Sequence, residues 1–76
     1  MKIIKGKDIL KAKDGIYKVI FNDGAFPRIG CKNGMIVSFF GTAYHLNLNE
    51  KRDLKSVKEL ELLIEGTGVD NEENDI

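Results

Sequence analysis

Turn dipeptides divide the first half of the chain into short apolar runs. Asp14-Gly15, Asp23-Gly24 and Asn33-Gly34 follow one another at intervals of nine or ten residues. Asn-Gly and Asp-Gly supply the positive φ angles of tight hairpin turns, and strands normally lie on either side of them. Residues 16–21 (IYKVIF) and 35–40 (MIVSFF) are rich in β-branched and aromatic residues, so both are predicted to be strands.

Alternation of apolar and polar residues continues the strand pattern into the second half. Residues 42–49 and 59–65 both alternate in this way, which is typical of strands with one buried face. The side chains expected to face the core are Tyr44, Leu46 and Leu48 in the first strand and Leu60, Leu62 and Ile64 in the second. Between them, residues 49–54 are predicted to form one helical turn, with Asn49 as its N-cap.

These elements predict a mainly β protein of about five to six short strands, with one helical turn before the last strand. The turn spacing favours a small SH3-like barrel, with an OB-like barrel as the second choice, or a β-meander. Residues 1–65 are expected to form this single small β domain. Residues 66–76 contain two glycines and mostly polar side chains, so they are predicted to be an acidic, disordered C-terminal tail.

Size and charge narrow the functional classes. A chain of 76 residues builds one modest core and has no room for a deep cleft between lobes, which argues against a large-pocket enzyme. The net charge of zero is unevenly distributed, because residues 1–64 carry 12 basic and 7 acidic side chains whereas residues 65–76 carry five acidic and no basic ones. The tail is then a solubilising terminus, a cover for the lysines, or a mimic of nucleic-acid charge.

The expected compartment is the cytoplasm. No apolar run approaches the roughly 20 residues that a membrane helix needs, so no membrane partner is expected. The N-terminus lacks the continuous apolar centre of a secretory signal. One cysteine cannot form an internal disulfide, which indicates a reducing environment.

Catalytic and cofactor chemistry finds little support in the residues. A nucleophilic cysteine needs a nearby base, and nothing in the spacing pairs Cys31 with His45, the only histidine. A structural zinc site needs four ligands, more than this chain offers in Cys and His. There is no phosphate-binding loop of the GxxxxGK[ST] type. We therefore expect no enzyme, no catalytic residue, no metal and no cofactor.

A row of lysines suggests a possible contact with nucleic acid. If residues 5–13 are extended, Lys5, Lys7, Lys11 and Lys13 share one face and could follow a phosphate backbone. Aromatic side chains that could stack on bases are Phe26, Phe39, Phe40 and Tyr44. The simpler reading is that the lysines protect an edge strand from unwanted pairing and that Phe39, Phe40 and Tyr44 belong to the core.

The segment FPRIGCK, between two of the turns, contains the candidate protein-binding site. It alternates well enough to be a short strand, and Pro27 would restrict that strand to an edge or to its first residues. Phe26 and Arg28 would then lie near the surface. Aromatic residues and arginine dominate binding hot spots, although plain structure explains the pair more simply.

The leading hypothesis is a non-catalytic interaction module that binds another protein through Phe26 and Arg28, as an inhibitor or regulator for example. One alternative is a weak, salt-sensitive nucleic-acid binder that uses Lys5, Lys7, Lys11 and Lys13. The other is a structural subunit that self-associates through an open strand edge.

Overall fold

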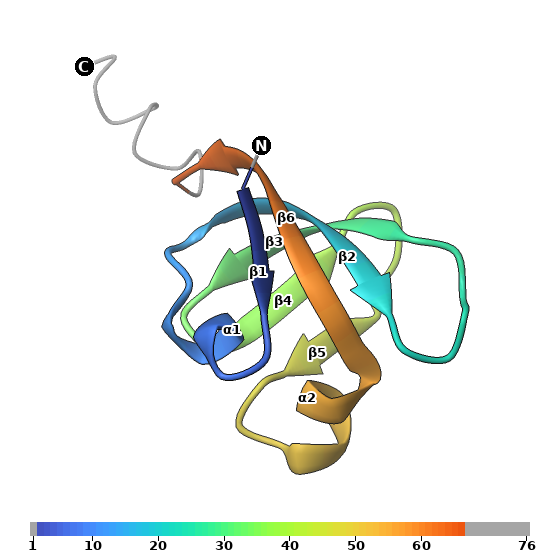
Figure 1. Cartoon of the computed structure of the whole chain (residues 1–76). Coiled ribbons are helices and arrows are strands. Elements are labelled where there is room, and N and C mark those ends of the chain that lie inside the picture. The colour runs from blue at the N-terminus through green and yellow to red at the C-terminus, as the bar shows by residue number, and fades with distance from the viewer. Residues whose placement is uncertain (1, 67–76) are drawn as a thin grey trace, which may run out of the picture.

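Six antiparallel strands form one sheet in the computed structural model, which describes residues 2–66 of the chain (Figure 1). The strands are β1 (Lys2–Lys5), β2 (Gly15–Phe21), β3 (Arg28–Asn33), β4 (Ile36–Phe39), β5 (His45–Asn47) and β6 (Val57–Glu65). Two short helices, α1 (Asp8–Lys11) and α2 (Lys51–Ser56), follow β1 and precede β6. The predicted mainly β fold and the helical turn before the last strand are confirmed.

The strand order is β1-β6-β2-β3-β4-β5, so β2 to β5 form a meander and β6 returns to lie between β1 and β2. Figure 1 shows β6 running beside β2 over most of its length. Within residues 2–66, β1 and β5 pair on one side only, which leaves the sheet open at both edges. The described strands therefore do not close into the barrel that the sequence predicts.

The N-terminal segment differs from the extended strand considered for the lysine row. Only residues 2–5 are extended, after which the chain turns at Gly6 and forms α1. Ile9 on α1 is buried in the core. Ile9, together with the half-buried Ala12, holds this single helical turn against the sheet.

Two of the three predicted turns have the expected positive φ at glycine, but only Asn33-Gly34 lies at a tight hairpin, because Asp23-Gly24 lies in the six-residue connection 22–27 between β2 and β3. Gly24 and Gly34 have φ angles of 85° and 66°, and Gly34 begins the two-residue loop that joins β3 to β4. Asp14-Gly15 is not a hairpin turn, because Gly15 is the first residue of β2. Gly15 approaches β6 so closely that a Cβ atom on this residue would lie 2.6 Å from the carbonyl oxygen of Ile64. Close strand approach, not a turn, requires this glycine.

A single apolar core lies on one face of the sheet. Its buried members are Ile9, Tyr17, Val19, Val37, Phe39, Leu46, Leu48, Val57 and Leu60. Phe39 confirms the core prediction, but Phe40 and Tyr44 are 60% and 48% exposed, so their assignment to the core is wrong. Phe40 follows Phe39 at the end of β4, where successive side chains point to opposite faces.

A β-bulge in β6 changes the face on which its last residues lie. Tyr17 is opposite Leu62 while Ile16 is opposite Ile64, so Leu63 is an extra residue in β6. Leu60 and Leu62 pack on the core as predicted, whereas Ile64 lies on the other face and is 59% exposed. Of the three residues predicted to face the core together, only Leu60 and Leu62 do so.

The helical turn also starts differently from the prediction. Glu50, not Asn49, precedes α2, and no side chain caps the helix. Asp53 inside the first turn instead accepts a hydrogen bond from the N–H of Asn47, at 2.9 Å. This bond ties α2 to β5.

The link between α1 and β2, residues 12–14, is held by hydrogen bonds from several elements. The Lys32 ammonium donates to the carbonyl of residue 12 at 2.7 Å, and the Tyr17 hydroxyl donates to that of residue 13 at 2.7 Å. The N–H of Gly66 donates to the carbonyl of residue 14, and that of Gly34 to the Asp14 carboxylate, each at 2.9 Å. Gly66 is the only residue of the predicted tail that the structure describes, and residues 67–76 lie outside it.

Replacing Lys32 with alanine should destabilise the protein. The side chain is 3% exposed, so Lys32→Ala leaves a cavity and removes the only donor to the Ala12 carbonyl. We expect a loss of about 2–3 kcal/mol in the free energy of unfolding, measured by urea denaturation. Lys51→Ala on the exposed surface of α2 is the control and should change it by less than about 0.5 kcal/mol. Equal stability of the two variants would show that the Lys32 contact contributes nothing.

Candidate functional site

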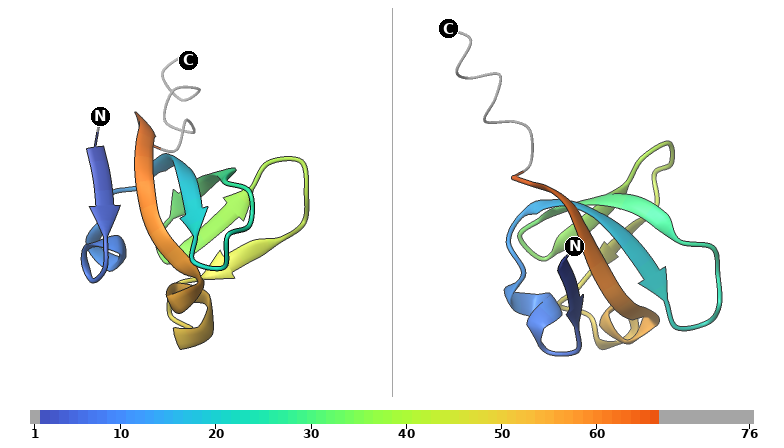
Figure 2. Two further views of the ribbon diagram at one scale, coloured as in Figure 1. Left: turned by 45° about the vertical axis from the view of Figure 1, so that its right-hand side comes forward. Right: turned by 45° about the horizontal axis from the view of Figure 1, so that its top comes forward.

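The loop between β2 and β3 carries the most exposed aromatic side chain among the described residues. Phe26 is 91% exposed, and the loop projects away from the sheet in Figure 1 and in the right-hand view of Figure 2. Asp23 fixes the loop locally, because its carboxylate accepts a hydrogen bond from the N–H of Ala25 at 2.9 Å. The predicted surface position of Phe26 is thus observed.

Of the two placements that Pro27 was expected to allow, an edge strand or the first residues of a strand, the structure has the second. β3 lies between β2 and β4 and is not an edge strand. Pro27 directly precedes β3, where its missing N–H removes no bond from the ladder. Phe26 and Arg28 are exposed because they lie in the projecting loop and at the first position of the strand.

Arg28 is held over an aromatic cluster that continues into the core. Its guanidinium carbon lies 5.9 Å from the centre of the Tyr44 ring, a cation–π distance. The Tyr44 ring stacks on Phe39 with centroids 5.3 Å apart and 15° between planes. Phe39 in turn contacts Phe21, at 6.0 Å and 42°. The buried ring of Phe39 therefore positions Tyr44, and Tyr44 positions the arginine.

A shallow hollow of about 240 Å³ lies beside this cluster, lined by Phe21, Asp23, Ala25, Arg28 and Tyr44. We call these five residues together with Phe26 the aromatic–arginine surface. The ion pairs of the described residues are Lys5–Glu59 and Lys13–Glu65, so Arg28 has no carboxylate partner within residues 2–66. The surface thus offers aromatic rings, a guanidinium that forms no ion pair within residues 2–66, and the Asp23 carboxylate.

Sequence reasoning missed Tyr44 and Phe21 as parts of this surface. Tyr44 alternates with Leu46 and Leu48, which assigned it to the core, but β5 begins only at His45. No short-range signal in the chain connects Arg28 with a residue 16 positions later, because their contact depends on the pairing of β3, β4 and β5.

The four lysines of the alternative site do not form a single row. Lys5 ends β1, Lys7 lies in the turn, Lys11 ends α1, and Lys13 is in the link to β2. The prediction that these lysines share one face, which required residues 5–13 to be extended, is therefore wrong. Nucleic-acid binding by these residues stays a prediction without that geometry.

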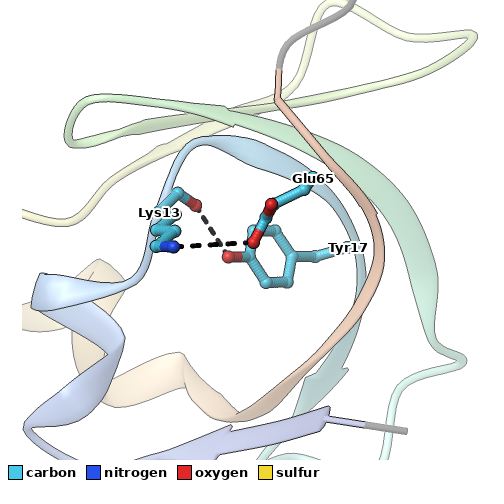
Figure 3. Close-up of polar contacts among 3 residues, drawn as sticks. All are labelled: Lys13, Tyr17 and Glu65. Carbon is cyan, nitrogen blue, oxygen red and sulfur yellow. Dashed lines mark hydrogen bonds and ion pairs between the residues drawn. The ribbon is translucent and has the colours of Figure 1, made fainter.

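Lys11 and Lys13, together with Lys2, line a second hollow of about 340 Å³ between the α1 segment and the end of β6. Figure 3 shows its inner part, where the Tyr17 hydroxyl donates to the Lys13 carbonyl and the Lys13 ammonium lies 3.6 Å from the Glu65 carboxylate. Asp8 also lines it. Because carboxylates lie among the lysines, this is a mixed-charge hollow. It does not offer the continuous positive surface that a phosphate backbone needs.

Cys31 and His45 are not in contact. Both lie on the face opposite the core, with Ser38 between them on β4, because Ser38 is opposite Cys31 and also opposite His45. Two strand spacings separate Cys31 from His45 by about 10 Å between Cα atoms. Across residues 2–66, no three His, Cys, Asp or Glu side chains are grouped to hold a metal, and no helix is long and apolar enough to span a membrane.

Comparisons with protein-family models, with curated proteins and with solved structures found no match to this chain.

Tyr17→Phe tests the hydrogen bond at the mixed-charge hollow. Burial raises the pKa of the Tyr17 hydroxyl above 10.0, and the Asp14 and Glu65 carboxylates raise it further. A folded pKa above the unfolded one gives stability that is present below pH 10.0 and is lost as the pH rises through the folded pKa. At about pH 7 the wild type should exceed Tyr17→Phe by about 1 kcal/mol in unfolding free energy, and this advantage should shrink above about pH 10.

Chemical denaturation at a series of pH values measures the difference. Tyr44→Phe, which removes an exposed hydroxyl, is the matched control and should follow the wild type at about pH 7. A difference between wild type and Tyr17→Phe that stays constant beyond about pH 11 would contradict the assignment of the alkaline loss to this group.

Proposed function

We propose that this chain is a non-catalytic interaction module that binds another protein through the aromatic–arginine surface. The observation that carries the proposal is the 91% exposed Phe26 beside an arginine that is already positioned over Tyr44. Leaving a phenyl side chain in water costs free energy that contact with a partner would recover. Aromatic residues and arginine are also the side chains most enriched in binding hot spots.

Pre-positioning of Arg28 supports a recognition role. A free arginine loses side-chain entropy when a partner immobilises it, and that loss reduces affinity. Here Tyr44, itself stacked on the buried Phe39, restricts the guanidinium before binding. The donors that face away from the ring are available to a partner carboxylate.

The partner segment that fits this surface combines a carboxylate with an apolar side chain. The carboxylate would pair with Arg28, which has no acidic partner within residues 2–66. The apolar group would contact Phe26 or enter the hollow lined by Phe21 and Tyr44. A small module of this kind would act by inhibiting or regulating the partner that it binds.

The proposal also includes a fold type and a cellular location. An SH3-like barrel is supported by the meander from β2 to β5 and by the return of β6 beside β2 around one core. A cytoplasmic location is supported by the free thiol of Cys31. Nucleic-acid binding has less support, because Lys5 and Lys13 lie in ion pairs with glutamates.

Selection from a phage-displayed peptide library provides the test. Peptides enriched on the wild-type protein should contain acidic and apolar residues, and titration calorimetry should give their affinities. Phe26→Ala and Arg28→Ala should each weaken binding by at least about tenfold. Phe26→Ala should leave the thermal midpoint almost unchanged, since the ring is in solvent.

Arg52→Ala is the matched control, because Arg52 is the only other arginine and is exposed on α2. Its affinity for the selected peptides should equal that of the wild type. Enriched peptides that bind all three variants equally would refute the proposed surface. Failure to enrich any peptide, together with salt-dependent binding of oligonucleotides in a fluorescence-anisotropy titration, would favour the lysine alternative instead.

A further inference from the structure

The face of the sheet opposite the core carries a second apolar surface. On β2, Ile16 and Lys18 are half-buried but do not pack against the core cluster, because they alternate with buried Gly15, Tyr17 and Val19. Neighbouring strands add exposed side chains to the same face. We call its central members the outer patch: Ile3, Ile16, Lys18, Ile29, Glu61 and Ile64.

The strand register orders the outer patch into two rows. One row crosses four strands as Ile3, Glu61, Lys18 and Ile29, on β1, β6, β2 and β3. The second row places Ile64 of β6 opposite Ile16 of β2. Isoleucines thus lie on three sides of one pair of opposite charges, and the next opposed pair on β2 and β6, Ile20 and Glu59, lies on the fourth.

The charged pair at the centre forms no ion pair among residues 2–66. Lys18 and Glu61 are directly opposite each other on β2 and β6, yet they form no ion pair, while the neighbouring pair Lys5–Glu59 does at 3.8 Å. Both side chains are half-buried in this apolar surrounding. A half-desolvated charge gains most from an additional partner of opposite sign.

We propose that the outer patch binds a second copy of this chain, forming a two-fold symmetric dimer in which the sheets pack face to face. A two-fold axis that runs along the strands between β6 and β2 exchanges these strands, and it also exchanges β1 with β3. Lys18 of each copy then faces Glu61 of the other. Ile64 faces Ile16, and Ile3 faces Ile29.

This self-complementarity selects a second copy over an unrelated partner. In a two-fold interface each residue contact occurs twice, so the patch must match its own exchanged image. Here both charges of the outer patch meet their opposites and its four isoleucines meet isoleucines, while the adjacent Glu59, already paired with Lys5, meets Ile20 at the rim. Aligned packing of two sheets about 10 Å apart accommodates such side chains.

Pairing through the open edge of β1 is less favourable. An antiparallel two-fold pair of β1 strands (KIIK) would place Lys2 of one copy near Lys5 of the other, and like charges on opposed positions destabilise a sheet. The aromatic–arginine surface takes no part in the proposed dimer, so this inference and the proposed function can fail separately.

Charge reversal and mixing test the dimer by sedimentation-velocity centrifugation between about 10 μM and about 1 mM protein. The wild type should show concentration-dependent dimerisation. Lys18→Glu and Glu61→Lys, each of which creates two like-charge contacts across the axis, should weaken it by at least about tenfold. An equimolar mixture of the two variants should recover association, because both charge pairs are complementary in the mixed dimer.

Recovery on mixing distinguishes a contact between copies from an effect within one chain. Lys51→Glu, the same reversal on exposed α2, is the control and should dimerise like the wild type. Circular dichroism of each variant establishes that it is folded before mixing, and Ile29→Lys provides a further patch variant that should reduce association without altering Lys18 or Glu61. A wild type that stays monomeric throughout the range, or variants whose mixture associates no better than each alone, would overturn the proposal.

Discussion

The backbone of residues 12–14 is the constraint that joins the N-terminal segment to the meander. Three consecutive carbonyls accept hydrogen bonds from the Lys32 side chain, the Tyr17 side chain and the Gly66 N–H. Each such bond contributes about 0.5–1.5 kcal/mol, and the bond from the charged Lys32 about 1.5–3 kcal/mol, so together they fix a link whose residues 13 and 14 are exposed. The bond to the Ala12 carbonyl also gives the buried Lys32 a partner, which a lysine inside a protein nearly always has. Lys32 lies opposite Gly15 and therefore fixes the start of β2 against β3.

Local pattern predicted most strands because each one has a distinct apolar face bounded by turn residues. Two of the turns, the meander and the last strand follow from that pattern. The errors arise where a contact distant in sequence decides the outcome. Ile9 reaches the core and holds α1 in a segment whose lysines suggested an extended strand. The bulge at Leu63 depends on pairing between β6 and β2, which alternation within β6 cannot reveal.

The candidate binding site was only half predictable for the same reason. Phe26 and Arg28 are singled out by their composition and by Pro27, and both are exposed. Tyr44 and Phe21, which give Arg28 its position and the hollow its walls, come from other strands. A small core explains this arrangement: Phe39 occupies the interior, and the aromatic rings that do not fit there stack outward from it to the surface.

The bulge in β6 connects the core with the outer patch. With uninterrupted pairing, Leu63 would lie opposite Ile16 on the outer face, and Ile64 would follow Leu60 and Leu62 on the core face. With the bulge, Ile64 lies opposite Ile16 instead. The bulge therefore removes Ile64 from the core face and places it on an exposed surface. The bulge thus leaves Ile64 outside the core of its own chain. In the proposed dimer, Ile16 of the second copy covers Ile64 across the two-fold axis.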